Sequence, residues 1–172
     1  GGDAIVVWQQ GEQVVAARVA ANSASSASST STARPVATLT ADGFSSLLAA
    51  QRGEVVVVNL WATWCVSCLK EIPDLVALAR EFAPRGVQLV AVSMDEPGDL
   101  AGVEAFRQKV FPDFASWLRA EPEMDTLVSR LDPAWNELLP TTYLVGRDGQ
   151  VLKRLQGRKS LEDFRGEITA LL

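Results

Sequence analysis

Residues 55–82 read VVVVNLWATWCVSCLKEIPDLVALAREF, and this stretch decides the fold. Val55 to Leu60 is an apolar run of the kind that forms a buried central strand. From Cys65 to Phe82 the apolar residues return at helical spacing, which predicts a helix. A buried strand should therefore pass within a few residues into a helix that begins at a Trp-Cys-Val-Ser-Cys sequence.

Cys65 and Cys68 occupy the start of this expected helix. The first backbone N–H groups of a helix lack partners and lie at the positive end of its dipole, so a thiolate is stabilised there and becomes a nucleophile near neutral pH. We expect Cys65 to attack a disulfide and Cys68, one turn further in, to resolve the mixed disulfide that forms. The pair would then be a redox-active disulfide that needs no other cofactor.

Two simpler interpretations of the pair are a structural disulfide and half of a zinc site. A disulfide that closes so short a loop restrains little of the unfolded chain's entropy. Zinc needs four ligands, and the chain has two cysteines and no histidine, so we expect no metal site. The missing imidazole also excludes Cys-His and Ser-His hydrolysis.

Glu71 is the second informative residue of the helix. A helical wheel places it between Leu78 and Phe82, inside the apolar arc that also holds Cys68. A carboxyl drawn toward a core has its pKa raised by desolvation, which suits a proton donor or acceptor for the resolving thiol. The alternative is a carboxylate at the rim of the arc that reaches water.

The remaining segments alternate between strand and helix patterns, which indicates an α/β protein with a mixed sheet covered by helices. Asp42 is expected to cap a helix that ends near Gly53. Residues 146–149, Gly-Arg-Asp-Gly, are a hairpin signal between two strand patterns. The expected strands are 55–60, 87–93, 141–145 and 150–155, and the expected helices are 65–82, 100–110, 124–131 and 160–172.

The beginning of the chain has a different composition. Residues 1–19 hold two apolar runs around Gln-Gln-Gly-Glu and predict a small hairpin without an assigned function. Residues 20–33 contain Ala, Ser, Thr and Asn alone, which predicts a flexible linker ahead of a domain over 34–172. The chain opens with Gly-Gly, so we expect any secretory signal or anchor to have been removed. The formal net charge of −5 and the lack of a basic run argue against nucleic acid as a partner.

Residues 59–73, NLWATWCVSCLKEIP, resemble the active-site segment of thioredoxin-like proteins, and most closely the TlpA/ResA/DsbE branch of bacterial extracytoplasmic thiol-disulfide reductases. Residues 139–145, LPTTYLV, resemble the cis-proline strand of that family. The resemblance implies a thioredoxin-like fold with an insertion over residues 95–119 and an N-terminal appendage. X-Pro bonds are mostly trans in folded proteins, so only the resemblance predicts that Pro140 is cis.

The resemblance also implies which residues act. The attacking cysteine, the resolving cysteine and the acidic residue beside them would be Cys65, Cys68 and Glu71. Substrate would be bound by Trp64, by Pro140 and by the backbone of Leu139, which offers strand-like hydrogen bonds to a peptide. Asn59 stands where thioredoxins proper carry a buried Asp, and an amide cannot exchange a proton, which leaves Glu71 as the proton carrier.

In function, the resemblance implies a reductase for disulfides of exported proteins, with the haem-attachment thiols of apocytochromes c among its substrates. Its electrons would come from a membrane-embedded thiol donor, and its location would be extracytoplasmic, in a bacterial periplasm or tethered to a membrane. The chain departs from the family at Val66-Ser67, where Pro usually precedes the second cysteine. The alternatives are a dithiol oxidant of the same fold, a peroxiredoxin-like peroxidase and a non-catalytic interaction domain.

Overall fold

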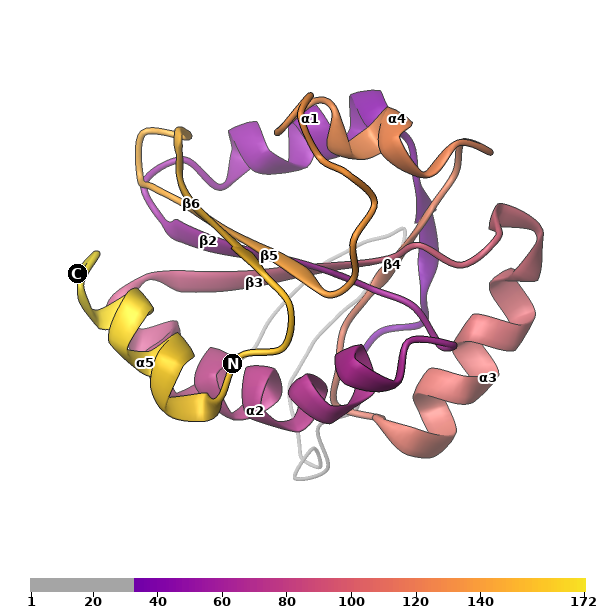
Figure 1. Ribbon diagram of the computed structural model, residues 1–172, viewed down its shortest axis with the longest axis horizontal. Helices are drawn as coiled ribbons and strands as arrows, with labels where there is room; N and C mark the ends of the chain where they lie inside the picture. The colour runs from indigo at the N-terminus through magenta and orange to yellow at the C-terminus, as the bar shows by residue number, and fades with distance from the viewer. Residues whose placement is uncertain (1–32) are drawn as a thin grey trace, which may run out of the picture. The chain divides into compact units, whose positions relative to one another are not determined.

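A six-stranded sheet with β2 (Val55–Trp61) near its middle organises the protein (Figure 1). The strand order is β1-β4-β3-β2-β5-β6. β1 to β4 run parallel to one another, whereas β5 and β6 are antiparallel to their neighbours, so the sheet is mixed as expected. The other strands are β1 (Ala37–Leu39), β3 (Val87–Ser93), β4 (Trp117–Arg119), β5 (Thr141–Val145) and β6 (Val151–Gln156).

The computed structural model describes residues 33–172. The hairpin expected in residues 1–19 and the linker expected over 20–33 lie outside the described residues, apart from Ala33. The Ala33 N–H donates to the carbonyl oxygen of Pro112 at 2.9 Å, so the first described residue is hydrogen-bonded to the rest of the described structure.

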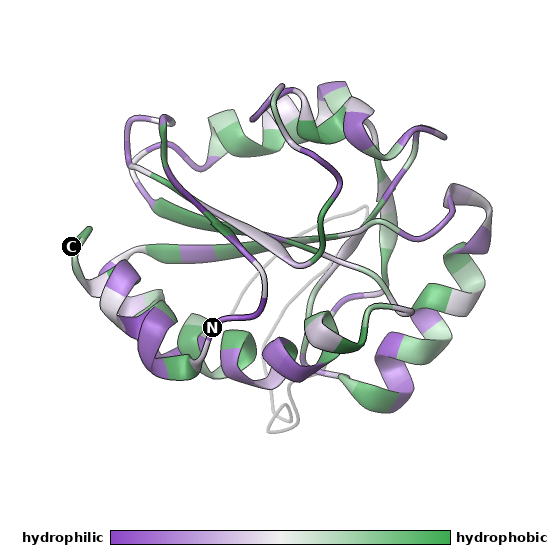
Figure 2. Ribbon diagram, in the orientation of Figure 1, coloured by the Kyte–Doolittle hydropathy of each residue, from purple (hydrophilic) through white to green (hydrophobic). Residues whose placement is uncertain are grey.

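Helices cover both faces of the sheet, α1 and α4 on one side and α2, α3 and α5 on the other (Figure 1). Their bounds are α1 (Ala41–Ala50), α2 (Val66–Phe82), α3 (Leu100–Val110), α4 (Met124–Val128) and α5 (Leu161–Thr169), with 3₁₀ turns η3 (Ala83–Arg85) and η4 (Pro97–Asp99). Apolar residues line the strands and the inner helix faces, and polar residues turn outward (Figure 2). Within residues 33–172, no helix combines the length and the apolar character needed to cross a membrane.

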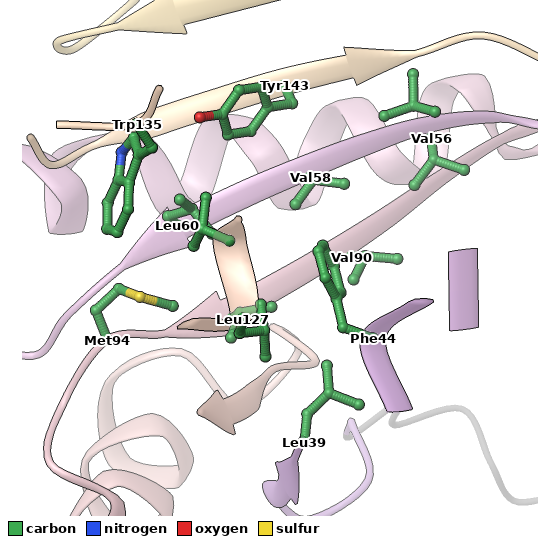
Figure 3. Close-up of a cluster of buried hydrophobic side chains, with 13 residues drawn as sticks. Leu39, Phe44, Val56, Val58, Leu60, Val90, Met94, Leu127, Trp135 and Tyr143 are labelled. Carbon is green, nitrogen blue, oxygen red and sulfur yellow. The ribbon is translucent and has the colours of Figure 1, made fainter. Parts of the chain in front are cut away.

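Every residue of β2 is buried, because the strand is paired on both edges and covered on both faces. Val56, Val58 and Leu60 contribute to the cluster beneath α1 and α4, where Phe44 of α1 packs beside Val90 and Leu127 (Figure 3). The alternate residues of β2 face α2 on the other side, since successive strand side chains point in opposite directions. Asn59 and Trp61 belong to this second set, which places them under the helix that carries the cysteines.

The structure confirms the expected strands and helices to within a few residues, with four corrections. The cap of α1 is Thr40 rather than Asp42: the Thr40 side chain accepts a hydrogen bond from the Gly43 N–H, and Asp42 lies in the first turn. The helix expected over 124–131 ends at Val128, and the last helix ends at Thr169. β1 and β4 were not predicted, because strands of three residues are too short for an alternating pattern to show.

The region expected to be an insertion, residues 95–119, contains η4, α3 and β4. β4 pairs with both β3 and β1, so this region extends the sheet at its parallel edge. The hairpin between β5 and β6 is confirmed: the Gly149 N–H donates to the Gly146 carbonyl oxygen at 2.9 Å, and Gly149 adopts a φ of 86° that favours glycine.

The burial of Phe44 gives a stability prediction. Its ring is fully buried between α1 and the sheet, so Phe44→Ala should lower the free energy of unfolding by about 3 to 5 kcal/mol, through lost transfer energy and a cavity. Denaturant unfolding of the oxidised protein measures this change. Leu152→Ala is the matched control because Leu152 is half exposed on β6, and its effect should stay within about 0.5 kcal/mol. Equal losses in the two variants would contradict the packing described.

Candidate functional site

The turn from β2 into α2 carries the two cysteines. The Cys65 N–H donates to the Ala62 carbonyl oxygen at 3.1 Å, which closes the turn, and Cys65 then caps α2 in an extended conformation. Its sulfur accepts a hydrogen bond from the Cys68 N–H at 3.2 Å and is bonded to the Cys68 sulfur in a disulfide, with the two Cα atoms 5.2 Å apart. The Cys65 sulfur, which we expect to be the nucleophile, therefore lies at the N-terminus of α2, as the sequence pattern predicts.

The two sulfurs differ in their access to solvent. Cys65 is 8% exposed and Cys68 is 1% exposed, within an apolar cluster that also includes Trp61 and Ile72. Trp64, directly before the nucleophile position, is 61% exposed. Cys65 thus keeps a small exposed fraction, whereas Cys68 keeps almost none. This asymmetry suits an attacking and a resolving cysteine.

Glu71 lies in the interior, as the helical wheel predicted, with only 1% of its surface exposed. Its Oε2 accepts a hydrogen bond from the Lys159 N–H at 2.7 Å, while no described group donates to its Oε1. Burial raises the pKa of Glu71 to about 7, against the lowering effects of the Lys159 backbone bond, of the Asn59 side chain and of the Lys159 and Arg158 charges. The carboxyl can therefore gain or lose a proton near neutral pH.

Asn59 lies beneath α2 at the same level. Its amide nitrogen donates to Thr142 Oγ1 on β5 at 3.0 Å, and its buried Oδ1, like Glu71 Oε1, has no donor among the described residues. The Asn59 side chain lowers the pKa of Glu71 and so offsets part of the effect of burial on that carboxyl.

The Leu139–Pro140 peptide bond is cis, so this prediction is confirmed. Pro140 is buried at the start of β5, and Leu139 packs against the cluster that contains both cysteines. The loop before the proline is held by Thr141, whose hydroxyl donates to the Leu138 carbonyl oxygen at 2.6 Å and accepts from Trp135 Nε1 at 3.1 Å. The segments of residues 65–71 and 139–140, which are far apart in the sequence, therefore meet at one end of the sheet.

The two tryptophans before the cysteines, Trp61 and Trp64, lie in different surroundings. Trp64 projects into solvent beside Cys65, while the neighbouring Trp61 is the buried ring, with Nε1 donating to Ser116 Oγ at 2.8 Å. The reason is strand alternation: Trp61 ends β2 facing the interior, and the turn that follows carries Trp64 outward. A binding role for Trp64, Leu139 and Pro140 stays a prediction.

Sequence reasoning missed Asp95, which lies directly after β3 and is bonded to Thr63 in the turn before Cys65. Its position could have been inferred from the two strand patterns, because β2 and β3 are parallel neighbours and the residues that follow them lie at the same edge of the sheet. Within residues 33–172, no three His, Cys, Asp or Glu side chains gather as they would around a metal ion.

Comparison with known proteins agrees with this geometry. A family model described as the AhpC/TSA family matches residues 31–160. Thiol-disulfide oxidoreductase ResA of Geobacillus thermodenitrificans is 29% identical over 124 residues, covering 70% of this chain and 64% of that protein. ResA of Geobacillus kaustophilus is 28% identical over 133 residues, covering 75% of this chain and 70% of that protein. The chain thus spans about two thirds of the length of these curated relatives.

Among solved structures, a thiol:disulfide interchange protein of the thioredoxin family from Chlorobium tepidum TLS superposes with a TM-score of 0.62 at 26% identity. The match covers 81% of this chain and 97% of that protein. With its helix-capping disulfide, its cis-proline and the extent of the family match, the chain belongs to the AhpC/TSA family and has the thioredoxin-like fold.

Proposed function

We propose that this protein is a thiol-disulfide oxidoreductase that reduces disulfides of other proteins through Cys65 and Cys68. The observation that carries the proposal is the disulfide at the N-terminus of α2, in which Cys65 is 8% exposed and Cys68 is 1% exposed. A disulfide in this position serves exchange better than stability, because it closes too short a loop to restrain the unfolded chain.

In the proposed reaction the Cys65 thiolate attacks one sulfur of a substrate disulfide, and the other substrate sulfur leaves as a thiolate. Cys68 then attacks the Cys65 sulfur, the second substrate thiolate leaves, and the Cys65–Cys68 disulfide forms. Two electrons pass to the substrate, and a dithiol donor must restore the reduced pair. Glu71, one turn beyond Cys68, accepts the proton of the resolving thiol, directly or through a water molecule.

Substrate binding is assigned to the surface around Cys65. The backbone of Leu139, ahead of the cis-proline, borders the cysteine cluster and provides hydrogen-bonding groups for an extended peptide. Exposed apolar side chains on both sides of Cys65, Trp64 and Val66, add a hydrophobic surface for residues that flank the substrate cysteine.

The reductive direction, the exported substrates and the extracytoplasmic location rest on the resemblance to the ResA and DsbE proteins. By the same argument the substrates include the haem-attachment thiols of apocytochromes c, and the electron donor is a membrane-embedded thiol carrier. A hairpin in residues 1–19 and a linker over 20–33 would precede the catalytic domain of residues 34–172.

The location gives a testable prediction. In intact cells of the source organism, a maleimide that cannot cross membranes should label the reduced cysteine pair. Labelling only after lysis would contradict the extracytoplasmic location.

The direction of electron flow is tested by the midpoint potential of the couple. We expect equilibration in graded thiol-disulfide buffers, followed by thiol trapping, to give a value near or below about −250 mV, as for reductants. A value above about −150 mV would make the protein an oxidant and reverse the assigned direction while keeping the chemistry.

The separate roles of the cysteines give a second prediction. Cys68→Ser should accumulate a mixed disulfide between Cys65 and a disulfide-bonded protein substrate such as insulin, because no thiol remains to resolve it. Cys65→Ser should form no adduct, since Cys68 is buried. Non-reducing gels and mass spectrometry measure both outcomes. Adducts on Cys68 in the Cys65→Ser variant would overturn the assignment.

Glu71 gives a prediction on pH dependence. Because the pKa of Glu71 lies at about 7, the wild-type rate of insulin reduction should depend on its ionisation in that range. Glu71→Gln keeps an acceptor for the Lys159 N–H but cannot take up a proton, so the rate should fall on the order of 10²-fold and lose that inflection. An unchanged profile would remove Glu71 from the reaction.

The same carboxyl should affect stability. The folded pKa of about 7 exceeds the ordinary value of 4.5, so between these pH values the folded state holds a proton that the unfolded chain releases. The free energy of unfolding of the wild type should therefore fall as pH rises from 4.5 to 7, relative to Glu71→Gln, by on the order of 3 kcal/mol. Urea unfolding of both oxidised proteins at several pH values measures the difference, and a constant difference would contradict the burial argument.

A further inference from the structure

Asp95 makes an unusual set of contacts at the carboxyl end of β3. The side chain is 4% exposed, and its two oxygens accept hydrogen bonds from the Thr63 N–H at 3.0 Å, the Thr63 hydroxyl at 2.6 Å and the Ser93 hydroxyl. The Ser93 oxygen in turn accepts the Asp95 N–H at 3.1 Å. We call these three residues, Ser93, Asp95 and Thr63, the Asp95 clamp.

The clamp acts on the turn that presents Cys65. Thr63 is the second residue of the turn over 62–65, whose ends are joined by the Cys65 N–H and the Ala62 carbonyl oxygen. Next to the clamp, the Met94 N–H donates to the Trp61 carbonyl oxygen at 2.7 Å. The end of β3 therefore holds the chain at Trp61 and again at Thr63, directly before the nucleophile position.

The hydrogen-bond partners of Asp95 are neutral groups, and no salt bridge to Asp95 is found among the described residues. Burial of a carboxyl without an opposite charge is unfavourable unless hydrogen bonds offset the cost of desolvation. The three hydrogen bonds to Asp95 provide this compensation. A small polar residue at the end of β3 could satisfy one turn N–H at less desolvation cost. Asp95 instead holds both the backbone and the side chain of Thr63.

The clamp matters most when the disulfide is reduced. In the oxidised protein the bond between the sulfurs itself keeps Cys65 against the first turn of α2. Reduction removes this covalent link, and the Cys65 sulfur then stays near the helix N-terminus only if the turn before it is held in place. A thiolate gains from the unpaired N–H groups only at that position.

We propose that Asp95 is a positioning residue for the redox pair: through Thr63 it holds the turn over 62–65 so that the Cys65 thiolate remains at the N-terminus of α2. The inference rests on the proposed thiol-disulfide exchange and adds a residue outside the cysteine motif to its machinery. The shift that we expect in the pKa of the Cys65 thiol is opposite in sign to the shift that a simple charge effect would cause. Removing a nearby negative charge stabilises a thiolate, whereas releasing the turn destabilises it.

The test titrates Cys65 by its thiolate absorbance in the Cys68→Ser background. Asp95→Asn and Thr63→Val should both raise the pKa of the Cys65 thiol by about half a unit to one unit, in line with the loss of one or two hydrogen bonds. Thr63→Ser keeps the hydroxyl and should behave as the parent protein. A fall in the thiol pKa in Asp95→Asn, or no change in Thr63→Val, would overturn the proposal.

Other charged groups near the pair are unchanged in these variants, so a difference in the thiol pKa reports on the substituted residue. On α2 these are Lys70 and Glu71, and on the loop after β6 they are Arg158 and Lys159. Beside Asp95 they are Arg119 on β4, which donates to the Met94 carbonyl oxygen at 3.1 Å, and Glu96, which lies 3.5 Å from Arg119. Repeating the titration in a Glu71→Gln background removes the one carboxyl whose pKa lies in the same range, and the upward shift should persist.

Tyr143→Phe is the matched control for a structural effect. It also removes a side-chain hydrogen bond to an Asp, the 2.7 Å bond from the Tyr143 hydroxyl to Asp132, but on the opposite face of the sheet. This variant should lose stability and leave the thiol pKa unchanged. A shift of similar size in Tyr143→Phe would show that general loosening, rather than the clamp, moves the thiol.

With both cysteines present, Asp95→Asn and Thr63→Val should shift the equilibrium with glutathione about three- to tenfold toward the disulfide form, because the reduced form loses its support. A shift toward the dithiol form would overturn the proposal.

If the wild type fails to reduce insulin, the proposed function is wrong, but the thiol titrations still test the clamp. If the wild type is active and the titrations show no shift, the clamp alone is wrong.

Discussion

The structure depends on the way in which β2 passes into α2. β2 is paired with β3 on one edge and with β5 on the other, and both faces are covered, so neither its direction nor its register is free to change. The chain leaves this strand at Trp61, makes one turn and starts a helix on Cys65. Because the first turn of that helix packs against the sheet, the position of the Cys65 sulfur is determined by the most buried part of the molecule.

This constraint places three site residues along one buried side of a single helix. Cys65 caps the helix and is 8% exposed, while Cys68 and Glu71, further along, are each 1% exposed. The interior that shields Cys68 from other thiols is also what raises the pKa of Glu71. The burial of Cys68 and the raised pKa of Glu71 therefore have one physical origin, which is the interior beneath α2.

The neighbours of β2 complete the site from two sides. The cis-proline directly precedes β5 and brings Leu139 against the cysteine cluster, while Asp95, two residues after β3, accepts hydrogen bonds from Thr63 in the turn before Cys65. Both contributions lie at the carboxyl end of β2, one from the antiparallel neighbour and one from the parallel neighbour. Neither lies within the cysteine motif, so a description of the site that stops at residues 59–73 leaves out the groups that hold it in place.

The local features of this protein can be read from its residues alone. The apolar run of Val55 to Leu60, the helical spacing after Cys65 and the wheel position of Glu71 depend only on residues close together in the chain, and each agrees with the structure. The tertiary structure decided what depends on distant neighbours. β1 and β4 are too short to be stable as strands without the rest of the sheet, Trp64 faces solvent because of the turn geometry, and the bonds of Asp95 to Thr63 join residues that the pairing of β2 with β3 brings together. Periodicity records which face of an element is buried, but it does not record which partner covers that face, and hydrogen bonds across a sheet edge depend on the partner.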